Sequence, residues 1–396
     1  VEFCMPKAYL ATVVALGGIS IVIYLRGRPV HRSSTLIRRA AFDIGSGYTK
    51  VLVADVRDGR IVGSVLYETE RKMSYKVDAQ QSPDGRLSEG IMRDGLKLLT
   101  ELTAMATELG AVEACGIATE VFRKAPNGAA FLQNMTQQTG LRISTIAQEA
   151  EARLGLATAE ALNGDMLDPL AAAWDSGGGS FQIAGRLHSG LQQLPALRSC
   201  KEWLWPEPIS VEHCALRTFT GTLGTGPAFE RLLVRVQSKP YSITTTPNPV
   251  TIDEAHALVQ LLQLELDPPA NWLRVASVVA IGGWNSIWPT ALRALHESAL
   301  PRGATQDALP QSGTLTIAEA SRALELVCNR TDDELLDVAG RFEGAEKPQF
   351  VVGKIALLVA VATHLGLEHI AFRPATGGCA GLMTLGKFHP LQKCEG

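Results

Sequence analysis

Two short glycine-bearing turns, each directly after an apolar run, constrain this chain more than any other feature. They are Asp43-Ile44-Gly45-Ser46-Gly47 and Asp175-Ser176-Gly177-Gly178-Gly179-Ser180. A strand that ends in Asp and turns on glycines presents backbone N–H groups to an anion, with a carboxylate nearby for a cation. Two such turns in one chain predict two similar halves that hold one phosphate chain from opposite sides. The expected protein is therefore an enzyme that acts on phosphates.

The bulk composition allows such an enzyme and excludes some other classes. A chain of 396 residues can form two medium-sized domains with proper cores. With 46% hydrophobic residues, 19% charged residues and a formal net charge of −3, the chain matches neither a disordered protein nor a general nucleic-acid binder. The seven cysteines are scattered and lack CxxC spacing, so neither a disulfide framework nor a zinc site is expected, and a reducing compartment is the simplest interpretation.

The N-terminal segment differs from the rest. Residues 8–25 carry no formal charge, and Arg26, Arg28 and Arg32 follow. This length is near the lower limit for crossing a bilayer, about 17–25 residues, so we expect an N-terminal apolar helix that anchors the protein in a membrane. The arginines predict that the catalytic body lies in the cytoplasm. The alternatives are a buried core helix, or a targeting presequence that leaves the body in the cytoplasm or an organelle after processing.

Periodicity in the body predicts alternating strands and helices. Strands are expected at 49–55 and 61–69, joined by a tight turn at Asp58-Gly59. A helix is expected from a Ser88 cap to Leu109, stopping at Gly110. Further strands are expected at 115–119, 143–146, 181–184, 275–281 and 370–372, and further helices at 129–139, 149–162, 251–266, 316–327 and 351–365.

The region between the two turns carries a resemblance to a known family. It contains Ala118-Thr119-Glu120-Val121-Phe122-Arg123-Lys124-Ala125-Pro126-Asn127 and later Glu149-Ala150-Glu151-Ala152-Arg153-Leu154. In this order and spacing the chain resembles the exopolyphosphatase/guanosine pentaphosphate phosphatase (Ppx/GppA) family of the actin/Hsp70/sugar-kinase superfamily, over residues 38–388. The resemblance implies an α/β fold with two actin-like (ribonuclease H-like) domains and a central interdomain cleft. The expected divisions are an anchor or targeting segment with a basic linker (1–37), domain I (38–165), domain II (166–388) and a tail (389–396).

The resemblance also implies an activity and its residues. Family members remove terminal phosphates, with Mg²⁺, from inorganic polyphosphate or a guanosine alarmone. The corresponding positions are Asp43 and Asp175 for the metal, Arg123 for phosphate and Glu151 as the catalytic base. The expected phosphate cradle consists of Gly45, Ser46, Gly47, Gly177, Gly178, Gly179 and Ser180. The alternatives for single residues are turn-capping aspartates, a surface ion pair for Arg123 and a solvated helix-face carboxylate for Glu151.

Several positions depart from the family pattern. Gln148 replaces a glycine, Ala150 a glutamate and Gln182 an acidic residue, and Trp284 stands where a threonine is usual. These departures keep open a second class, a catalytically weak sensor that binds polyphosphate or nucleotide. A kinase of the same superfamily is disfavoured, because the Gly282 region lacks a clear adenosine-binding glycine pattern. The expected partners are polyphosphate or an alarmone and a membrane through residues 8–25, with no nucleic acid; the chain could form a homodimer.

Overall fold

The computed structural model describes residues 11–16, 19–24, 35–163, 172–186, 216–268, 277–299, 313–340 and 347–391. It divides into two units, Val1–Leu36 and Ile37–Gly396. The first unit contains two antiparallel strands, β1 (Ala11–Leu16) and β2 (Ile19–Tyr24). The N-terminal apolar helix expected from the sequence is therefore wrong for these residues. Half or more of each segment is β-branched (Thr and Val in the first, Ile and Val in the second), and such side chains lose rotamer freedom in a helix and favour strands.

Among the residues that the structure describes, one helical stretch is long and apolar enough to cross a bilayer. It is Pro348–Leu365, and most of it is buried within the fold. Burial of this kind is typical of the central helix of a packed domain, which meets the same length and composition criteria.

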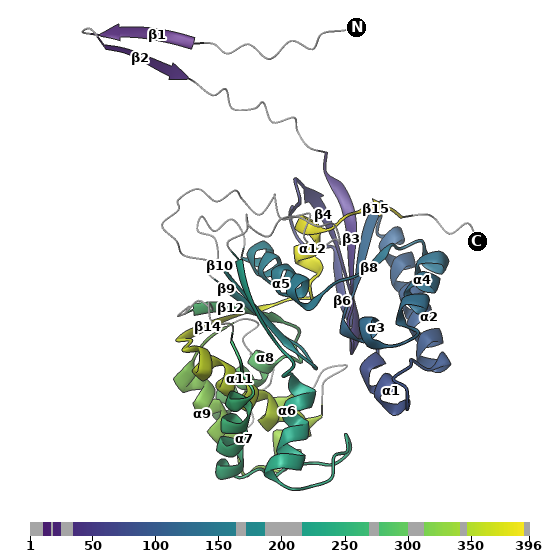
Figure 1. Ribbon diagram of the computed structural model, residues 1–396, viewed down its shortest axis with the longest axis vertical. Helices are drawn as coiled ribbons and strands as arrows, with labels where there is room; N and C mark the ends of the chain where they lie inside the picture. Colours follow the sequence, from purple (N-terminus) through teal and green to yellow (C-terminus); the bar gives the residue numbers. More distant parts are fainter. Residues whose placement is uncertain are drawn as a thin grey trace. The chain divides into compact units, whose positions relative to one another are not determined.

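Two sheets in the second unit share one plan (Figure 1). In the first sheet, β3, β4 and β6 form an antiparallel meander, β7 lies parallel beside β3, and β8 lies parallel beside β7. In the second sheet, β9, β10 and β11 form the meander, β12 lies parallel beside β9, and β14 lies parallel beside β12. The two similar halves predicted from the paired turns are thus present in the α/β fold.

Most expected strands agree with the observed bounds, but the single strand expected at 61–69 is wrong, because β5 ends at Ile61 and β6 begins only at Tyr67. The strands of the first sheet are β3 (Ile37–Ile44), β4 (Tyr48–Arg57), β5 (Arg60–Ile61), β6 (Tyr67–Lys72), β7 (Glu113–Ala118), β8 (Ile143–Thr145) and β15 (His389–Pro390). Those of the second are β9 (Ala172–Ser176), β10 (Phe181–Arg186), β11 (Leu216–Gly221), β12 (Ser277–Gly282), β13 (Gly313–Thr316) and β14 (His369–Pro374). The turn between β4 and β5 has positive φ at Asp58 (53°) and Gly59 (74°), as a two-residue hairpin requires.

Most helices cover the outer faces of the sheets, and α2 begins at the predicted cap. The helices are α1 (Tyr75–Gln81), α2 (Glu89–Glu108), α3 (Glu120–Lys124), α4 (Gly128–Thr139), α5 (Gln148–Leu162), α6 (Thr225–Arg231), α7 (Ile252–Leu264), α8 (Ile287–Ala299), α9 (Ile317–Val327), α10 (Leu336–Ala339), α11 (Val351–Leu365) and α12 (Cys379–Leu385). Ser88 caps α2, while Thr251 and Thr316 form complete capping boxes with Glu254 and Glu319. Helices α1, α3, α6, α8, α10 and α12 were not predicted. All of these except α8 have at most seven residues, which give no clear period.

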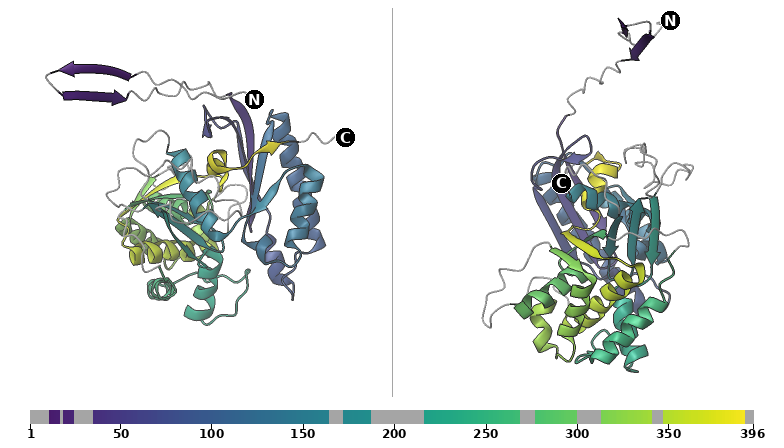
Figure 2. Two further views of the ribbon diagram at one scale, coloured as in Figure 1. Left: turned by 45° about the horizontal axis from the view of Figure 1, so that its top comes forward. Right: turned by 90° about the vertical axis from the view of Figure 1, so that its left-hand side faces the viewer.

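Helices α5 and α12 pack against each other and join the two sheets (Figures 1 and 2). One face of α5, with Ala150 and Leu154, belongs to a buried cluster that includes α12 and the first sheet. Another face, with Ala152 and Leu156, packs on Ala173, Ala184 and Ile281 of the second sheet. Helix α5, which precedes the expected domain boundary at 165/166, therefore also packs on the second sheet, and α12, which follows that boundary, packs on the first sheet. His389 and Pro390, expected in a tail, pair with β7.

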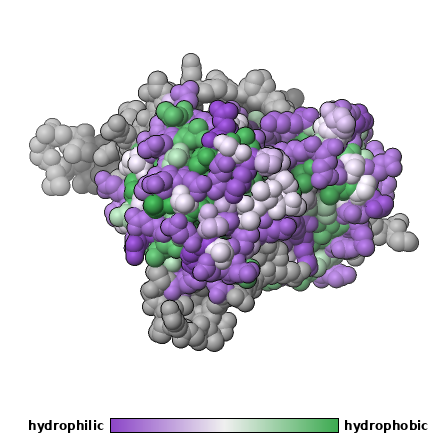
Figure 3. Space-filling model, turned by 90° about the horizontal axis from the view of Figure 1, so that it is seen from below, coloured by the Kyte–Doolittle hydropathy of each residue, from purple (hydrophilic) through white to green (hydrophobic). Residues whose placement is uncertain are grey.

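Hydrophilic residues predominate on the face of the molecule that Figure 3 shows, with apolar residues scattered among them. The large apolar side chains are instead gathered in the interior, among them Trp174, Trp288, Phe42 and Phe372. Burial of these rings supplies much of the stabilisation on which the position of the strand ends depends.

The crossing of α5 and α12 yields a stability prediction. The Gly381 N–H donates to Thr158 Oγ1 (3.1 Å), and a Cβ on Gly381 would lie only 2.7 Å from the Leu154 carbonyl oxygen. Gly381→Ala should therefore lower the free energy of unfolding in urea by about 1–3 kcal/mol. The matched control is Gly90→Ala in α2, where a Cβ meets nothing closer than 3.7 Å. That change should raise the free energy of unfolding by about 0.5–1 kcal/mol; equal effects would show that the helix crossing is not tight.

Candidate active site

The two predicted turns occupy equivalent places in the two halves. Asp43 and Asp175 are each the next-to-last residue of the first meander strand. The Gly45 N–H donates to the Tyr48 carbonyl (2.9 Å), and the Gly177 N–H donates to the Ser180 carbonyl (2.9 Å). Each turn is closed by the same bond at the same distance from its aspartate. The repeated pattern in the sequence thus corresponds to a repeated backbone structure.

Lys50 lies among carboxylates that come from both halves. In the register of the first sheet it stands opposite Asp43 on one side and Glu70 on the other. Burial works to lower the pKa of the Lys50 ammonium, but the charges of Glu70, Asp43 and Asp175 outweigh it and raise the pKa above its ordinary value. Lys50 therefore stays charged, and the aspartates of the two turns share one electrostatic environment around it.

The pKa of Asp175 is raised by burial and by the carboxylates near it. Burial raises the pKa of its carboxyl to about 6; Lys50 opposes the shift, and the charges of Asp43 and Glu70 add to it. A bound cation would relieve this repulsion. The same site is approached from the second half at Gly283, where a Cβ would lie 2.4 Å from Glu70 Oε1.

The segment before α12 also reaches Asp43. The Gly378 N–H donates to Asp43 Oδ2 (2.9 Å), and a Cβ on Gly377 would lie 2.2 Å from the same oxygen. Gly377 has φ of 55°, in the left-handed region that favours glycine. This contact between β3 and the C-terminal region holds the carboxylate in place, and no local pattern in the sequence predicted it.

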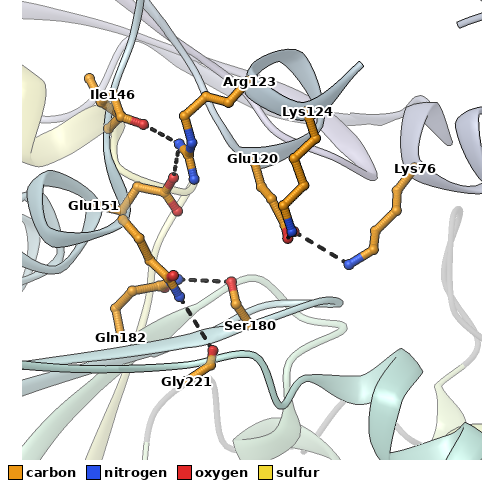
Figure 4. Close-up of polar contacts among 10 residues, drawn as sticks. Lys76, Glu120, Arg123, Lys124, Ile146, Glu151, Ser180, Gln182 and Gly221 are labelled. Atoms are coloured by element: carbon orange, nitrogen blue, oxygen red, sulfur yellow. Dashed lines mark hydrogen bonds and ion pairs between the residues drawn. The ribbon is translucent and has the colours of Figure 1, made fainter. Parts of the chain in front are cut away.

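Arg123 and Glu151, both predicted site residues, pair with each other (Figure 4). Arg123 Nη1 donates to Glu151 Oε1 (2.8 Å) and to the Ile146 carbonyl. Burial raises the pKa of Glu151 to about 7; Arg123 lowers it in part, and the charges of Asp43 and Asp175 raise it further. Glu151 is thus within the field of both aspartates, and its side chain is only 15% exposed. It is not the solvated helix-face carboxylate considered from the sequence.

The departures from the family pattern have structural roles. Gln182 is buried opposite Asp175 in the register, and its amide donates to Ser180 Oγ (2.9 Å). Gln148, at the start of α5, donates to the Gly221 carbonyl (3.3 Å) and so ties α5 to β11. Ala150 is buried in the contact with α12.

Trp284, the remaining departure, is partly exposed. Its ring lies edge-on to Phe372 at 6.4 Å, and its backbone carbonyl accepts a hydrogen bond from Arg293.

The described residues contain no group of three or more His, Cys, Asp or Glu that could hold a metal ion by themselves. Two carboxylates, those of Asp43 and Asp175, interact electrostatically and could together supply two ligands. Mg²⁺ commonly takes one or two carboxylates and completes its octahedron with waters and substrate phosphates. This donor set therefore suits Mg²⁺ bound together with a phosphate, and not a cation held in a cage of protein ligands.

Sequence reasoning missed Lys50, Glu70 and Lys76. Lys76 lies in α1, in the first half of the molecule, but its side chain reaches the glycine turn of the second half. A Cβ on Gly179 would lie 2.3 Å from its ammonium nitrogen. A signal for Lys50 did exist: it lies within a strand, on the face that the hairpin geometry brings opposite Asp43. Lys76 had no such signal, because its neighbour Gly179 lies far along the chain.

These features define a class of protein. Two mixed sheets of the same plan form an actin-like α/β fold, with a charged site in which Lys50 interacts with the strand-end aspartates of both halves. Comparison with known structures supports this fold. The Ppx/GppA enzyme of Aquifex aeolicus superimposes with a TM-score of 0.62 at 19% identity, covering 88% of this chain and 99% of that one. An exopolyphosphatase from Cytophaga hutchinsonii gives a TM-score of 0.60 at 17% identity, covering 87% and 96%.

The sequence comparisons point to the same family. Residues 52–188 match the Ppx/GppA phosphatase family, so the resemblance expected from the motifs is confirmed. An uncharacterized protein of Streptomyces coelicolor is 30% identical over 173 residues. This match spans 42% of the present chain and only half of the relative's length.

The pKa of Glu151 yields a prediction about stability. Its carboxyl ionises near pH 4.5 when unfolded and near 7 in the folded chain. Its contribution to stability is therefore complete below about pH 4.5 and is lost as the pH rises through about 7, by up to about 3 kcal/mol. Urea unfolding between pH 5 and pH 8 should show a shallower decline for Glu151→Gln than for the wild type. The exposed Glu149→Gln should behave as the wild type; equal slopes for all three proteins would contradict the burial of Glu151.

Proposed function

We propose that this chain is a phosphohydrolase that releases terminal orthophosphate from inorganic polyphosphate or a guanosine penta- or tetraphosphate. The observation that carries the proposal is Glu151, a largely buried carboxylate with a pKa near 7, within the field of two strand-end aspartates. A base of this kind is matched to accept a proton from water near neutral pH. The family match over residues 52–188 supports the same reaction class.

The two turns are suited to bind phosphate through their backbones. In the first turn, the Ser46 carbonyl accepts from the Lys76 N–H and the Gly47 carbonyl from the Met73 N–H. In the second, the carbonyls of Gly177 and Gly178 accept from the N–H groups at the start of α6. Because carbonyl and N–H point in opposite directions across a trans peptide, the N–H group that follows each of these carbonyls points away from the group that donates to it. We propose that they donate to phosphoryl oxygens, together with the hydroxyls of Ser46 and Ser180.

Hydrolysis also requires charge compensation and a held base. Arg123 fixes the Glu151 carboxylate through Nη1. We propose that its other N–H groups bind the terminal phosphate, which brings that phosphate and the base together. Glu151 then removes a proton from the water that attacks the phosphorus atom in line with the leaving phosphate.

Mg²⁺ is the proposed cofactor. Asp43 and Asp175 would hold it, and when bound it would neutralise charge on the phosphoryl oxygens. The raised pKa of Asp175, caused first by burial and then by its charged neighbours, is consistent with a carboxylate whose usual partner is a cation.

A second candidate function is a binding protein that senses polyphosphate or nucleotide without turning it over. The observation that favours it is Gln182, an amide opposite Asp175 where the family pattern has an acid. Such a protein would retain the turns and the basic groups but react slowly.

We also propose a location for the protein. From the uncharged segment at 8–25 and the arginines after it, we infer that the chain attaches to a membrane with its body in the cytoplasm.

The proposed function is tested by orthophosphate release. With Mg²⁺, the wild type should release orthophosphate from long-chain polyphosphate or from the guanosine substrate. Glu151→Gln should lower the turnover about 10²–10⁴-fold, because the base is lost, while equilibrium binding is retained. Glu149→Gln, an exposed change two residues earlier on the same helix, is the control and should react as the wild type. If the wild type and Glu151→Gln are equally inert yet bind the substrate, the sensor replaces the hydrolase.

A further inference from the structure

We propose that Lys76, Glu120 and Lys124 form a second phosphate-binding position beside the 177–180 turn. It would hold phosphate units of the substrate chain other than the one that is cleaved. The inference rests on the proposed function, because it assigns a further part of the same polyphosphate-binding surface. We call these three residues the Lys76 cluster.

Two ammonium groups meet one carboxylate in the Lys76 cluster (Figure 4). Lys76 Nζ lies 3.3 Å from one Glu120 oxygen, and Lys124 Nζ lies 2.5 Å from the other. Burial alone would raise the pKa of Glu120, but the hydrogen bond from Lys124 and the charge of Lys76 lower it below its ordinary value. The carboxylate is therefore ionised at neutral pH, and the cluster retains an excess of positive charge.

The Lys76 cluster contacts both glycine turns. The Lys76 backbone N–H donates to the Ser46 carbonyl (3.0 Å) in the first turn. At the second turn, a Cβ on Gly179 would lie 2.3 Å from Lys76 Nζ and 3.3 Å from Glu120 Oε2. The absence of a side chain at Gly179 is what lets these groups reach the turn. An ordinary surface ion pair does not require such an approach from a distant segment.

The cluster is held on a rigid base. Tyr75, beside Lys76, is fully buried and packs edge-on against Phe122 at 4.9 Å. Phe122 lies in α3 between Glu120 and Lys124. Aromatic packing therefore fixes α1 relative to α3, and the two lysines are positioned before any ligand binds.

The charges of the site change sign along its length. Around Lys50, the carboxylates of Asp43, Asp175 and Glu70 outnumber the ammonium, which suits a cation. In the Lys76 cluster the ammonium groups outnumber the carboxylate, which suits an anion. A phosphate that replaces Glu120 as the partner of Lys76 would carry charge on several oxygens and form charge-assisted bonds. Such a phosphate would belong to a chain whose end lies at Glu151 and Arg123.

Equilibrium binding tests the proposal without requiring turnover. The probes are long-chain polyphosphate, tripolyphosphate and orthophosphate, each with Mg²⁺. Lys76→Gln should weaken binding of long-chain polyphosphate about tenfold, since one charge-assisted bond is lost, and should change orthophosphate binding little. Glu120→Gln should tighten binding of long-chain polyphosphate, because the competing carboxylate is removed. Lys76→Arg should restore most of the affinity, which shows that a fold defect is not the cause.

The matched control is Lys97→Gln, which removes an exposed lysine on α2. If Lys76→Gln and Lys97→Gln weaken binding equally, only general charge attraction is present and the inference is wrong. It is also wrong if Glu120→Gln weakens binding as Lys76→Gln does, since the pair then acts as a structural ion pair. If polyphosphate binding depends on Lys76 but no orthophosphate is released, the proposed hydrolysis fails and the binding position stands. If the wild type hydrolyses polyphosphate and Lys76→Gln binds it normally, the proposed hydrolysis stands and the second binding position is wrong.

Discussion

The site depends on one lysine held among carboxylates from both halves of the molecule. Lys50 keeps its charge in spite of burial because Glu70, Asp43 and Asp175 surround it. Without it, the like charges of the strand-end aspartates would repel each other at close range in a poorly solvated place. With it, Asp43 and Asp175 share one electrostatic environment that contains a positive charge. The pKa of Asp175 is still raised, first by burial and then by the charges of Asp43 and Glu70, and an added cation would favour its ionised form.

The packing of α5 against α12 is the second constraint on the geometry of the site. Helix α5 carries Glu151 and packs on both sheets, while α12 packs on α5 and on the first sheet. The segment before α12 also holds Asp43 through the Gly378 N–H. Glu151 and Asp43 are therefore positioned by the same helix pair and the segment before it. A loss of packing between α5 and α12 would move both, so that the stability of this crossing and the geometry of the site are linked.

Sequence reasoning succeeded where the signal was local. The glycine turns after Asp43 and Asp175 and the Ser88 cap are each specified by a few adjacent residues, and the structure contains them. The importance of Lys50 and Lys76 depends on pairing between segments far apart in the chain, which one sequence does not reveal. Residues 11–16 and 19–24 were misassigned to a helix because hydropathy does not specify backbone conformation, and their Val and Ile residues favour strands.

The central claim is that Asp43 and Asp175 together form a site for a divalent cation. The most direct test is the change in thermal unfolding temperature on adding Mg²⁺ at pH 8 and at pH 5. Ligand that binds only the folded chain raises this temperature. We predict a clear rise at pH 8, a smaller one at pH 5 because the pKa of Asp175 is about 6, and none at either pH for Asp175→Asn. Asp94→Asn, an exposed change on α2, should respond as the wild type. An equal rise for the wild type and Asp175→Asn would contradict the account.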